Sequence, residues 1–383
     1  MRITAVSFVA VNVTPKTNWS FLVVRTEDGR EGIGECTLAE HEMALESEAA
    51  RLGRTLVGQD SRRRTLLARL IPHAPAGLVR HAVLSALDQA LWDLEGQRVG
   101  EPIHLRLGGA VREGIKLYAN INRGVAHRTP EGFAEAARRA MAEGFDAVKL
   151  APFDPLVWED ASDPGFRAAY ARGLDRVAAV RAAVGPDIAV MIDCHWRFSA
   201  GGAAALITDL AAASPFSVEC PVAESNLAAL RRLRGRANDR GIRLAGAETL
   251  AGLASFAPVL GAEAHDVVMH DIKYCGGHEE MRRIAALAHL HGVEIAPHNP
   301  TGPVCHAHSV HAALAIPNAT LLEVQFGETP LFFEIVCGSV PAATGGRAEA
   351  PDAPGLGCAL RPGVAAERPW VPIDRPWLDP RLG

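Results

Sequence analysis

The sequence lacks three features that would place it in a narrower class of protein. Its seven cysteines include no C-x-x-C pair, and their odd number argues against a disulfide framework. Its formal net charge of -5 leaves no excess of basic residues, so we expect no nucleic-acid partner and no anionic-lipid surface. It has no uncharged apolar run of about 18 residues, the length that a membrane-spanning helix needs.

The N-terminal segment MRITAVSFVAVNV alternates polar and apolar residues and lacks a long apolar stretch with a cleavage site. It therefore predicts a strand rather than a signal peptide. Together with the unpaired cysteines, this favours the cytoplasm, with no membrane attachment. The chain has 383 residues, 48% of them hydrophobic, which is enough for two domains or for one large α/β barrel with an addition.

The first part of the chain predicts an α+β module. Strand patterns cover residues 2–11, 20–29 and 30–38, and EDGREG is a hairpin signal between the last two. Helical patterns follow at 41–58 and 78–100. We expect an N-terminal capping domain over residues 1–113, completed by the C-terminal tail 345–383, whose Pro and Gly content predicts an irregular structure.

From about residue 114 short apolar runs alternate with amphipathic segments. The expected strands are IKLYANI, FDAVKLA, IAVMID, FSVECP, IRLAGAE, DVVMHD, VEIAPH and TLLEVQF. The expected helices between them are PEGFAEAARRAMAEG, AAYARGLDRVAAVRAAVG, LAALRRLRGRANDRG and HEEMRRIAALAHLHG. Eight buried strands alternating with helices predict a (β/α)₈ barrel over residues 114–344, and the whole chain is of the α/β class.

Ionisable residues end six successive strands of this predicted barrel. They are Asp193, Glu219, Glu248, Asp271, His298 and Glu323, at separations of 26, 29, 23, 27 and 25 residues. Solvation of strand ends explains any one of them. Six in register is a different case, because the carboxyl ends of barrel strands converge on one face and like charges gathered there would repel each other. The pattern therefore predicts one charged active site.

A cation would relieve that repulsion. Asp193, Glu219 and Glu248 come from adjacent strands and supply the hard oxygen ligands that suit Mg²⁺. A metal that prefers sulfur or imidazole is less favoured, since neighbouring side chains on a strand face opposite sides. We therefore expect Cys194 and Cys220 to face away from the two acids and to pack.

The same alternation returns His195 to the side of Asp193. From the residues alone it could be an acid or base, a second metal ligand, or a solvated loop histidine.

The chain resembles the enolase superfamily, in particular its mandelate racemase subgroup. The resemblance rests on AVLSALDQALWDLEGQ at 82–97, on the ordered acids Asp193, Glu219 and Glu248, and on an Asp271-His298 pair with CGG at 275–277. Within the subgroup, DCHWR and APHNPTGPV are similar to sugar-acid dehydratases of the galactonate dehydratase type.

The resemblance implies a set of roles. Mg²⁺ would neutralise the charge that develops when a proton α to a carboxylate is removed. His298 would be the base, and Asp271 would fix its tautomer. Glu323, protonated or sharing a hydrogen bond, would support the second carboxylate oxygen.

Family members that racemise usually carry Lys-x-Lys on the second barrel strand. This chain has Lys149, but Ala151 stands where the second lysine would be. Lys149 would then bind the substrate carboxylate, and His195 would act as general acid toward a departing β-hydroxyl. The implied reaction is β-elimination of water from a hydroxy acid, giving a 2-keto acid.

Other charged residues receive weaker assignments. Lys273, two residues after Asp271, is expected to form a salt bridge rather than to act as a base. His306, His308 and His311 lie on an expected helix after the seventh barrel strand, where histidines usually pack or face solvent.

Substrate contacts are expected from a few polar and aromatic residues. These are Asn120, Asn122, Arg123, Arg197, Trp19 and Trp196, with further specificity from Asn18 and segment 35–42. A polyhydroxylated small-molecule acid suits such a lining. A cyclic hydroxy amino acid such as a hydroxyproline also fits, and a racemase or epimerase and a non-catalytic binding barrel remain open. We expect a homo-oligomer.

Overall fold

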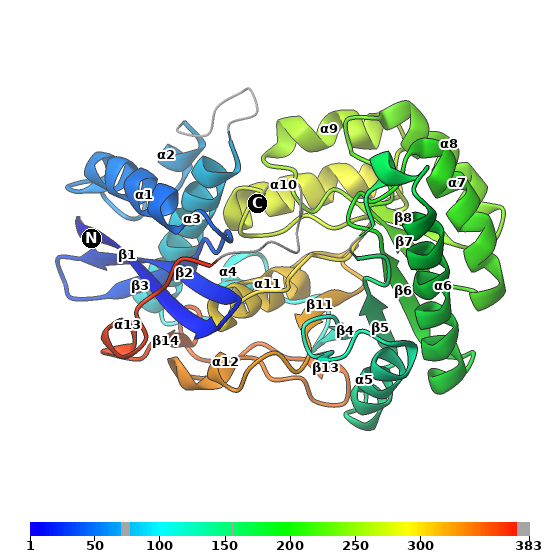
Figure 1. Ribbon diagram of the computed structural model, residues 1–383. Coiled ribbons are helices and arrows are strands. Elements are labelled where there is room, and N and C mark those ends of the chain that lie inside the picture. The colour runs from blue at the N-terminus through cyan, green and yellow to red at the C-terminus, as the bar shows by residue number, and fades with distance from the viewer. Residues whose placement is uncertain (70–76, 155, 374–383) are drawn as a thin grey trace.

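The computed structural model of the protein describes residues 1–69, 77–154 and 156–373. Its N-terminal part is an antiparallel sheet in the order β1-β2-β3, with helices packed on it (Figure 1). The strands are β1 (Ile3–Thr14), β2 (Thr17–Thr26) and β3 (Glu31–Glu35). The helices are α1 (Glu42–Leu56), α2 (Thr65–Ala68), α3 (Leu78–Val99) and α4 (Ile103–Arg106).

Helix α3 joins this sheet to the rest of the molecule. Every residue from His81 to Gly96 is buried, because the helix packs against β3 on one side and against α10 on the other. Gly34 of β3 faces α3 so closely that an added Cβ would lie 2.0 Å from the Ala86 carbonyl oxygen. This contact explains why a glycine stands in the strand.

The second part of the molecule is a curled parallel sheet surrounded by helices. Its strands are β4 (Ile115–Asn120), β5 (Ala147–Leu150), β6 (Ala189–Asp193), β7 (Ser217–Glu219), β8 (Arg243–Gly246), β9 (Val267–Val268), β10 (Glu294–Ile295) and β11 (Leu322–Gln325). The neighbours run from β4 to β10 in sequence order, and β11 returns to pair with β4. Thr320 N donates to Ile295 O at 2.9 Å, which brings β10 next to the segment before β11.

Helices follow the strands around the outside. They are α5 (Pro130–Ala142), α6 (Pro164–Val184), α7 (Ala200–Asp209), α8 (Leu227–Asn238), α9 (Leu253–Gly261), α10 (Gly277–Leu290), α11 (Pro303–Ala315) and α12 (Leu331–Glu334), with 3₁₀ turns at Trp158–Asp160 and Leu210–Ala213. Side chains of Thr129, Asp163, Ser199 and Asn226 cap α5, α6, α7 and α8 by accepting from backbone N–H groups of the first turn.

The predicted barrel architecture is confirmed, and three of the helices around it, α7, α9 and the short α12, were missed. Helix α7 begins with AGG and α9 contains Pro258, and both features weaken a helical pattern. The tail was predicted to be irregular, which is wrong in part: β13 (Arg347–Ala348) pairs with β4, and β14 (Cys358–Leu360) pairs with β12 (Val336–Gly338). Helix α13 (Val364–Glu367) follows, and the tail from residue 374 lies outside the described residues.

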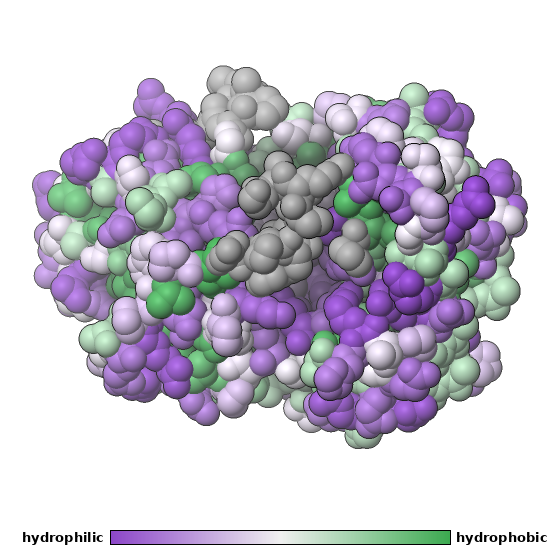
Figure 2. Space-filling model, viewed as in Figure 1, coloured by the Kyte–Doolittle hydropathy of each residue, from purple (hydrophilic) through white to green (hydrophobic). Residues whose placement is uncertain are grey.

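No helix in the described parts of the chain is long and apolar enough to cross a membrane. The face seen in Figure 2 is mostly hydrophilic, and its green patches are small and separated by purple side chains. All seven cysteines are free, as expected.

Candidate active site at the carboxyl ends of the barrel strands

The six predicted strand-end residues gather at one end of the barrel. Asp193 and Glu219 are the last residues of β6 and β7, and Glu323 lies within β11. Glu248, Asp271 and His298 lie just beyond the ends of β8, β9 and β10. The five acids are all at least 95% buried, so the cluster concentrates negative charge where water cannot screen it.

Lys149, from the end of β5, provides positive charge at the centre of these acids. Its Nζ lies 2.9 Å from Glu219 Oε1, 2.9 Å from Glu323 Oε1 and 3.7 Å from Asp193 Oδ2. Burial disfavours the ammonium ion, but the attraction of Glu219 and Glu323 outweighs burial and raises the pKa of Lys149. Burial and the repulsion of Asp193 raise the pKa of Glu219 well above its ordinary value.

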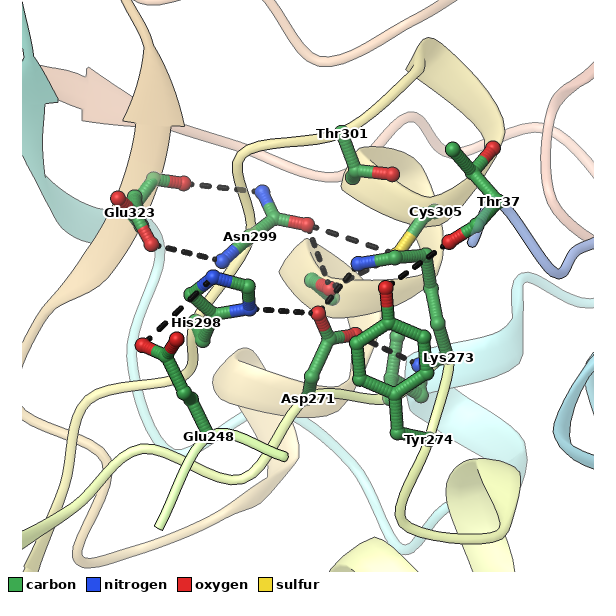
Figure 3. Close-up of polar contacts among 12 residues, drawn as sticks. Thr37, Glu248, Asp271, Lys273, Tyr274, His298, Asn299, Thr301, Cys305 and Glu323 are labelled. Atoms are coloured by element: carbon green, nitrogen blue, oxygen red, sulfur yellow. Dashed lines mark hydrogen bonds and ion pairs between the residues drawn. The ribbon is translucent and has the colours of Figure 1, made fainter. Parts of the chain in front are cut away.

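His298 and Asp271 form the predicted pair. His298 Nδ1 lies 2.8 Å from Asp271 Oδ2, and His298 Nε2 lies 3.7 Å from Glu248 Oε2 (Figure 3). The Lys273 ammonium is paired with the same Asp271 oxygen, so the expected salt-bridge role of Lys273 is confirmed. Burial opposes ionisation of Asp271, but Lys273 and His298 lower its pKa.

Glu323 is held by hydrogen bonds at both oxygens. Asn120 Nδ2 donates to Oε1 at 2.7 Å, and the Asn299 backbone N–H donates to Oε2 at 3.0 Å. Burial opposes its charged form, but Lys149 and His298 lower the pKa of Glu323. This direction favours the shared carboxylate over the protonated acid.

His195 lies beside Asp193, as predicted, but the backbone reaches this position by a different route. The chain leaves β6 at Asp193, and His195 and Trp196 adopt left-handed φ values of 44° and 56°. His195 Nε2 lies 3.0 Å from Asp193 Oδ2, and its Nδ1 lies 3.3 Å from Asp154 Oδ1. Burial opposes protonation, but Asp193 and Asp154 raise the pKa of His195.

The cysteines that follow Asp193 and Glu219 differ in the direction that their side chains face. Cys194 packs in the apolar layer between strands and helices, as predicted. The prediction that Cys220 faces away from the acids is wrong, because its φ of 45° ends the strand alternation directly after Glu219. Cys220 Sγ and carboxylate oxygens of Glu219 and Glu248 all lie within 4.8 Å of one another.

Two of the six residues named as substrate contacts, Asn120 and Asn122, lie beside the acid cluster. Asn120 contacts Glu323, and Asn122 accepts from the Ala151 N–H at 2.6 Å. Arg197 contacts Asp154, the acid beside His195, with its Nε 3.3 Å from Asp154 Oδ1.

Trp19, named among the substrate contacts, is a buried strand residue. It lies within β2, is 1% exposed, and packs among apolar side chains of the N-terminal sheet and α11. The segment after β3 does reach the site region, because Tyr274 donates its hydroxyl to Thr37 O at 2.9 Å.

The three histidines of α11 are buried packing residues. His308 Nε2 lies 2.9 Å from Ile33 O, and His306 Nε2 lies 3.1 Å from Pro341 O. His311 Nδ1 lies 3.1 Å from His104 Nδ1. All three are buried and none forms a hydrogen bond or ion pair with an acid of the cluster among the described residues, in agreement with the packing prediction.

Sequence reasoning assigned no contact to three polar residues around the site, although Glu35 begins the segment 35–42 that was named for specificity. Asn299 orients Glu323, Asp154 contacts His195, and Glu35 binds the start of α11. The N-P that follows His298 marks a turn, but no sequence pattern pairs Asp154 with a histidine on the next strand.

The acid cluster fits a divalent cation. Asp193, Glu219 and Glu248 bring carboxylate oxygens from three neighbouring strands, and Glu248 Oε2 is buried with no hydrogen-bond donor among the described residues. A buried oxygen of this kind needs a positive partner. The set consists of hard oxygen donors with one thiol beside them.

Comparison with known proteins identifies the family of both parts of the chain. Residues 4–108 match the family model of the mandelate racemase/muconate lactonizing enzyme N-terminal domain, and residues 132–364 match that of the enolase C-terminal domain-like family.

The relatives carry names from this group. The chain is 32% identical to a D-galactonate dehydratase of Verminephrobacter eiseniae over 81% of this chain and 78% of the relative. It is 31% identical to a D-gluconate dehydratase of Thermoproteus tenax, over 90% and 68% respectively. A solved mandelate racemase/muconate lactonizing enzyme from Jannaschia superposes with a TM-score of 0.85 and 27% identity, covering 97% of this chain and 98% of that one. The chain therefore belongs to the mandelate racemase/muconate lactonizing enzyme group of the enolase superfamily.

Proposed function

We propose that the protein is an Mg²⁺-dependent dehydratase that converts a hydroxy acid, an aldonate or related sugar acid, to a 2-keto acid. The observation that carries the proposal is the His298–Asp271 pair beside a buried cluster of three carboxylates, with alanine at position 151. Relatives named galactonate and gluconate dehydratase support the same class of reaction and of substrate.

The metal would be held by Asp193, Glu219 and Glu248. Enolase superfamily members bind a divalent metal, and all-oxygen ligation favours Mg²⁺. When bound, Mg²⁺ supplies positive charge that stabilises the enolate of the substrate carboxylate. It would also offset the repulsion among these three acids.

His298 would remove the α-proton. Its Nδ1–H donates to Asp271, which leaves the Nε2 lone pair on the side of the acid cluster, where Glu248 lies 3.7 Å away. Asp271 stabilises the imidazolium that forms, and Lys273 keeps Asp271 ionised. Lys149 would balance the charge of the substrate carboxylate, and Asn120 and Asn122 would form hydrogen bonds with the hydroxyl groups of the substrate.

His195 would act on the leaving group. It comes from β6, while the pair around His298 comes from β9 and β10 across the ring of strands. Ala151 is 1% exposed and carries no ionisable group, so no second lysine competes on β5. The proton from His195 would therefore go to a departing β-hydroxyl, and Arg197 would contact the substrate from the same turn.

A keto-acid screen tests the proposal. A library of aldonates, with D-galactonate and D-gluconate first and hydroxyprolines included, is incubated with the protein and Mg²⁺, and 2-keto acid is detected as its semicarbazone. We expect product from an aldonate, none from the His298→Asn variant, and none after chelation. Exchange of the α-proton with solvent deuterium and inversion without keto acid would instead show a racemase or epimerase. Product from a hydroxyproline alone would contradict the sugar-acid assignment.

A further inference from the structure

A second His–Asp pair lies across the barrel from the first. His195 Nδ1 is 3.3 Å from Asp154 Oδ1, and Asp154 comes from the segment directly after β5. The two pairs have the same construction, because each histidine follows one strand and its acid follows the strand before: β6 and β5 here, β10 and β9 for His298 and Asp271. In the strand order β5 and β9 are four strands apart in a ring of eight, so the pairs face each other.

Asp154 is fixed by more than the histidine. Arg197 Nε lies 3.3 Å from Asp154 Oδ1, and Arg128 Nη2 lies 3.7 Å from Asp154 Oδ2. The same Arg128 nitrogen donates to Ala151 O at 2.7 Å, and Arg197 Nη1 donates to Leu156 O at 3.2 Å. These contacts tie the segment after β5 to the turn after β6, so Asp154 has a defined place from which to hold a side chain.

The His195 ring, unlike Asp154, has few contacts that fix its orientation. Its backbone lies in the left-handed region, and its N–H donates to Asp193 Oδ1 at 3.0 Å, which fixes the main chain. The ring is partly exposed, and Asp193 contacts only its Nε2 edge. Without Asp154, the ring could turn about its side-chain bonds, and Nε2 would leave the acid cluster.

We propose that Asp154 is a positioning residue for the elimination step. By accepting from Nδ1, it sets the tautomer of His195 and keeps Nε2 toward the substrate. In that step the β-carbon–oxygen bond breaks with its electron pair going to oxygen, and the His195 proton joins that oxygen to release water. The electron pair left on the α-carbon by His298 forms the carbon–carbon double bond of the enol. This inference rests on the proposed dehydratase function.

The test separates proton abstraction from elimination. Wild type and the variants Asp154→Ala and Asp154→Asn, each saturated with Mg²⁺, react in D₂O with the aldonate found in the screen. Keto acid and the deuterium content of the remaining substrate are measured together. Asp160→Ala, a change at an exposed acid of the same segment, is the matched control.

We expect Asp154→Ala to lower kcat for keto-acid formation about 10- to 100-fold with little change in KM, the range typical of a residue that orients an active group. Exchange at the α-position should persist, so the ratio of exchange to elimination should rise about tenfold or more. Asp154→Asn should retain more activity than Asp154→Ala, because its amide oxygen still accepts from Nδ1. Asp160→Ala should match wild type.

Three results would overturn the role of Asp154: an unchanged rate in Asp154→Ala, equal loss of exchange and elimination, or equal loss in the alanine and asparagine variants. If Asp154→Ala does not fold, the exchange-to-elimination ratio of Asp154→Asn decides, and a ratio equal to that of wild type overturns the role. A wild-type protein that exchanges the α-proton but never forms keto acid would overturn the proposed function itself. The two failures are therefore distinguishable.

Discussion

The fully buried Asp271 carboxylate contacts two basic side chains. Lys273 and His298 both contact its Oδ2, and the Lys273 backbone N–H donates to Oδ1 at 2.7 Å. A buried ion pair is not a strong source of stability in itself, but removing one partner leaves a buried charge without compensation. Lys273 therefore belongs to the machinery that keeps Asp271 ionised.

We expect Lys273→Met to lower the free energy of unfolding by about 3 kcal/mol, because Asp271 loses its nearest full charge. Urea unfolding followed by circular dichroism measures the change. The matched control is Lys116→Met, which removes an exposed partner of Asp146 and should cost less than about 1 kcal/mol. Equal losses in the two variants would contradict a special role for the buried pair.

At the scale of elements, the last residue of strand β3 in the N-terminal sheet accepts hydrogen bonds from the N-terminus of helix α11 in the barrel. Glu35 is fully buried and accepts from the backbone N–H of Gly302 and of Cys305, each at 2.9 Å, and from the Thr301 hydroxyl at 2.6 Å. A carboxylate at this end satisfies free N–H groups and complements the helix dipole. The two parts of the molecule are thus joined by polar contacts as well as by apolar packing.

We expect Glu35→Gln to lower the free energy of unfolding by about 2 kcal/mol, since an amide offers one acceptor where two are used and turns a donor toward a buried N–H. Thermal or urea unfolding of the variant and of wild type measures this loss of stability. Glu31→Gln on the same strand, at an exposed pair with Arg25, should change stability by less than about 1 kcal/mol. A larger loss at Glu31 than at Glu35 would show that the contact with α11 contributes little.

The same helix makes the fold sensitive to acid. Burial lowers the pKa of His308 from 6.5 to about 3 and that of His306 to about 4. Since the unfolded chain then binds protons that the folded state excludes, this contribution to stability is complete above pH 6.5 and is lost as the pH falls through the window down to the folded pKa.

We therefore expect the His308→Gln variant to lose about 1–2 kcal/mol less unfolding free energy than wild type between pH 7.5 and pH 5. Urea unfolding at both pH values gives the difference. In His289→Gln, a change at an exposed position of α10, the unfolding free energy should depend on pH as it does in wild type. Parallel slopes for wild type and His308→Gln would mean that His308 takes up its proton equally in both states.

The order of the strands and helices could be predicted from the sequence, but the positions of several single side chains could not. Alternating apolar runs located the eight barrel strands, and the spacing of the acids predicted that they gather at one end of the barrel, since both depend on local patterns. Cys220 and Trp19 were misplaced for different reasons. A left-handed residue ended the strand alternation at Cys220, and Trp19 packs on α11, a partner far away in the sequence. Asp154 and Glu35 were missed because their partners lie on other elements, and the domain boundaries stay a prediction.

At the scale of the whole molecule, we expect the buried acid cluster to couple the stability of the fold to metal binding. Burial and repulsion by Asp193 raise the pKa of Glu219, so the cluster without a cation carries an electrostatic cost. A ligand that binds only the folded state stabilises it, by about 2.7 kcal/mol at a hundredfold excess over its Kd.

We expect saturating Mg²⁺ to raise Tm by several degrees relative to the chelated protein, and Glu219→Gln to abolish most of that rise. Differential scanning fluorimetry with and without Mg²⁺ measures both. Glu135→Gln, at an exposed acid of α5, should keep the full shift. An undiminished shift in Glu219→Gln would place the metal elsewhere.

The contact between Glu35 and α11 also sets a constraint on how the chain is made. The acid and its Cys305 partner are 270 positions apart, so a ribosome completes the first on the order of tens of seconds before the second. Throughout that interval the nascent chain holds this carboxylate with the neighbouring Thr37 hydroxyl as a donor but without the three donors that residues 301–305 supply. The N-terminal sheet can therefore reach its final state only after most of the barrel has emerged, which makes its maturation late although its synthesis is early.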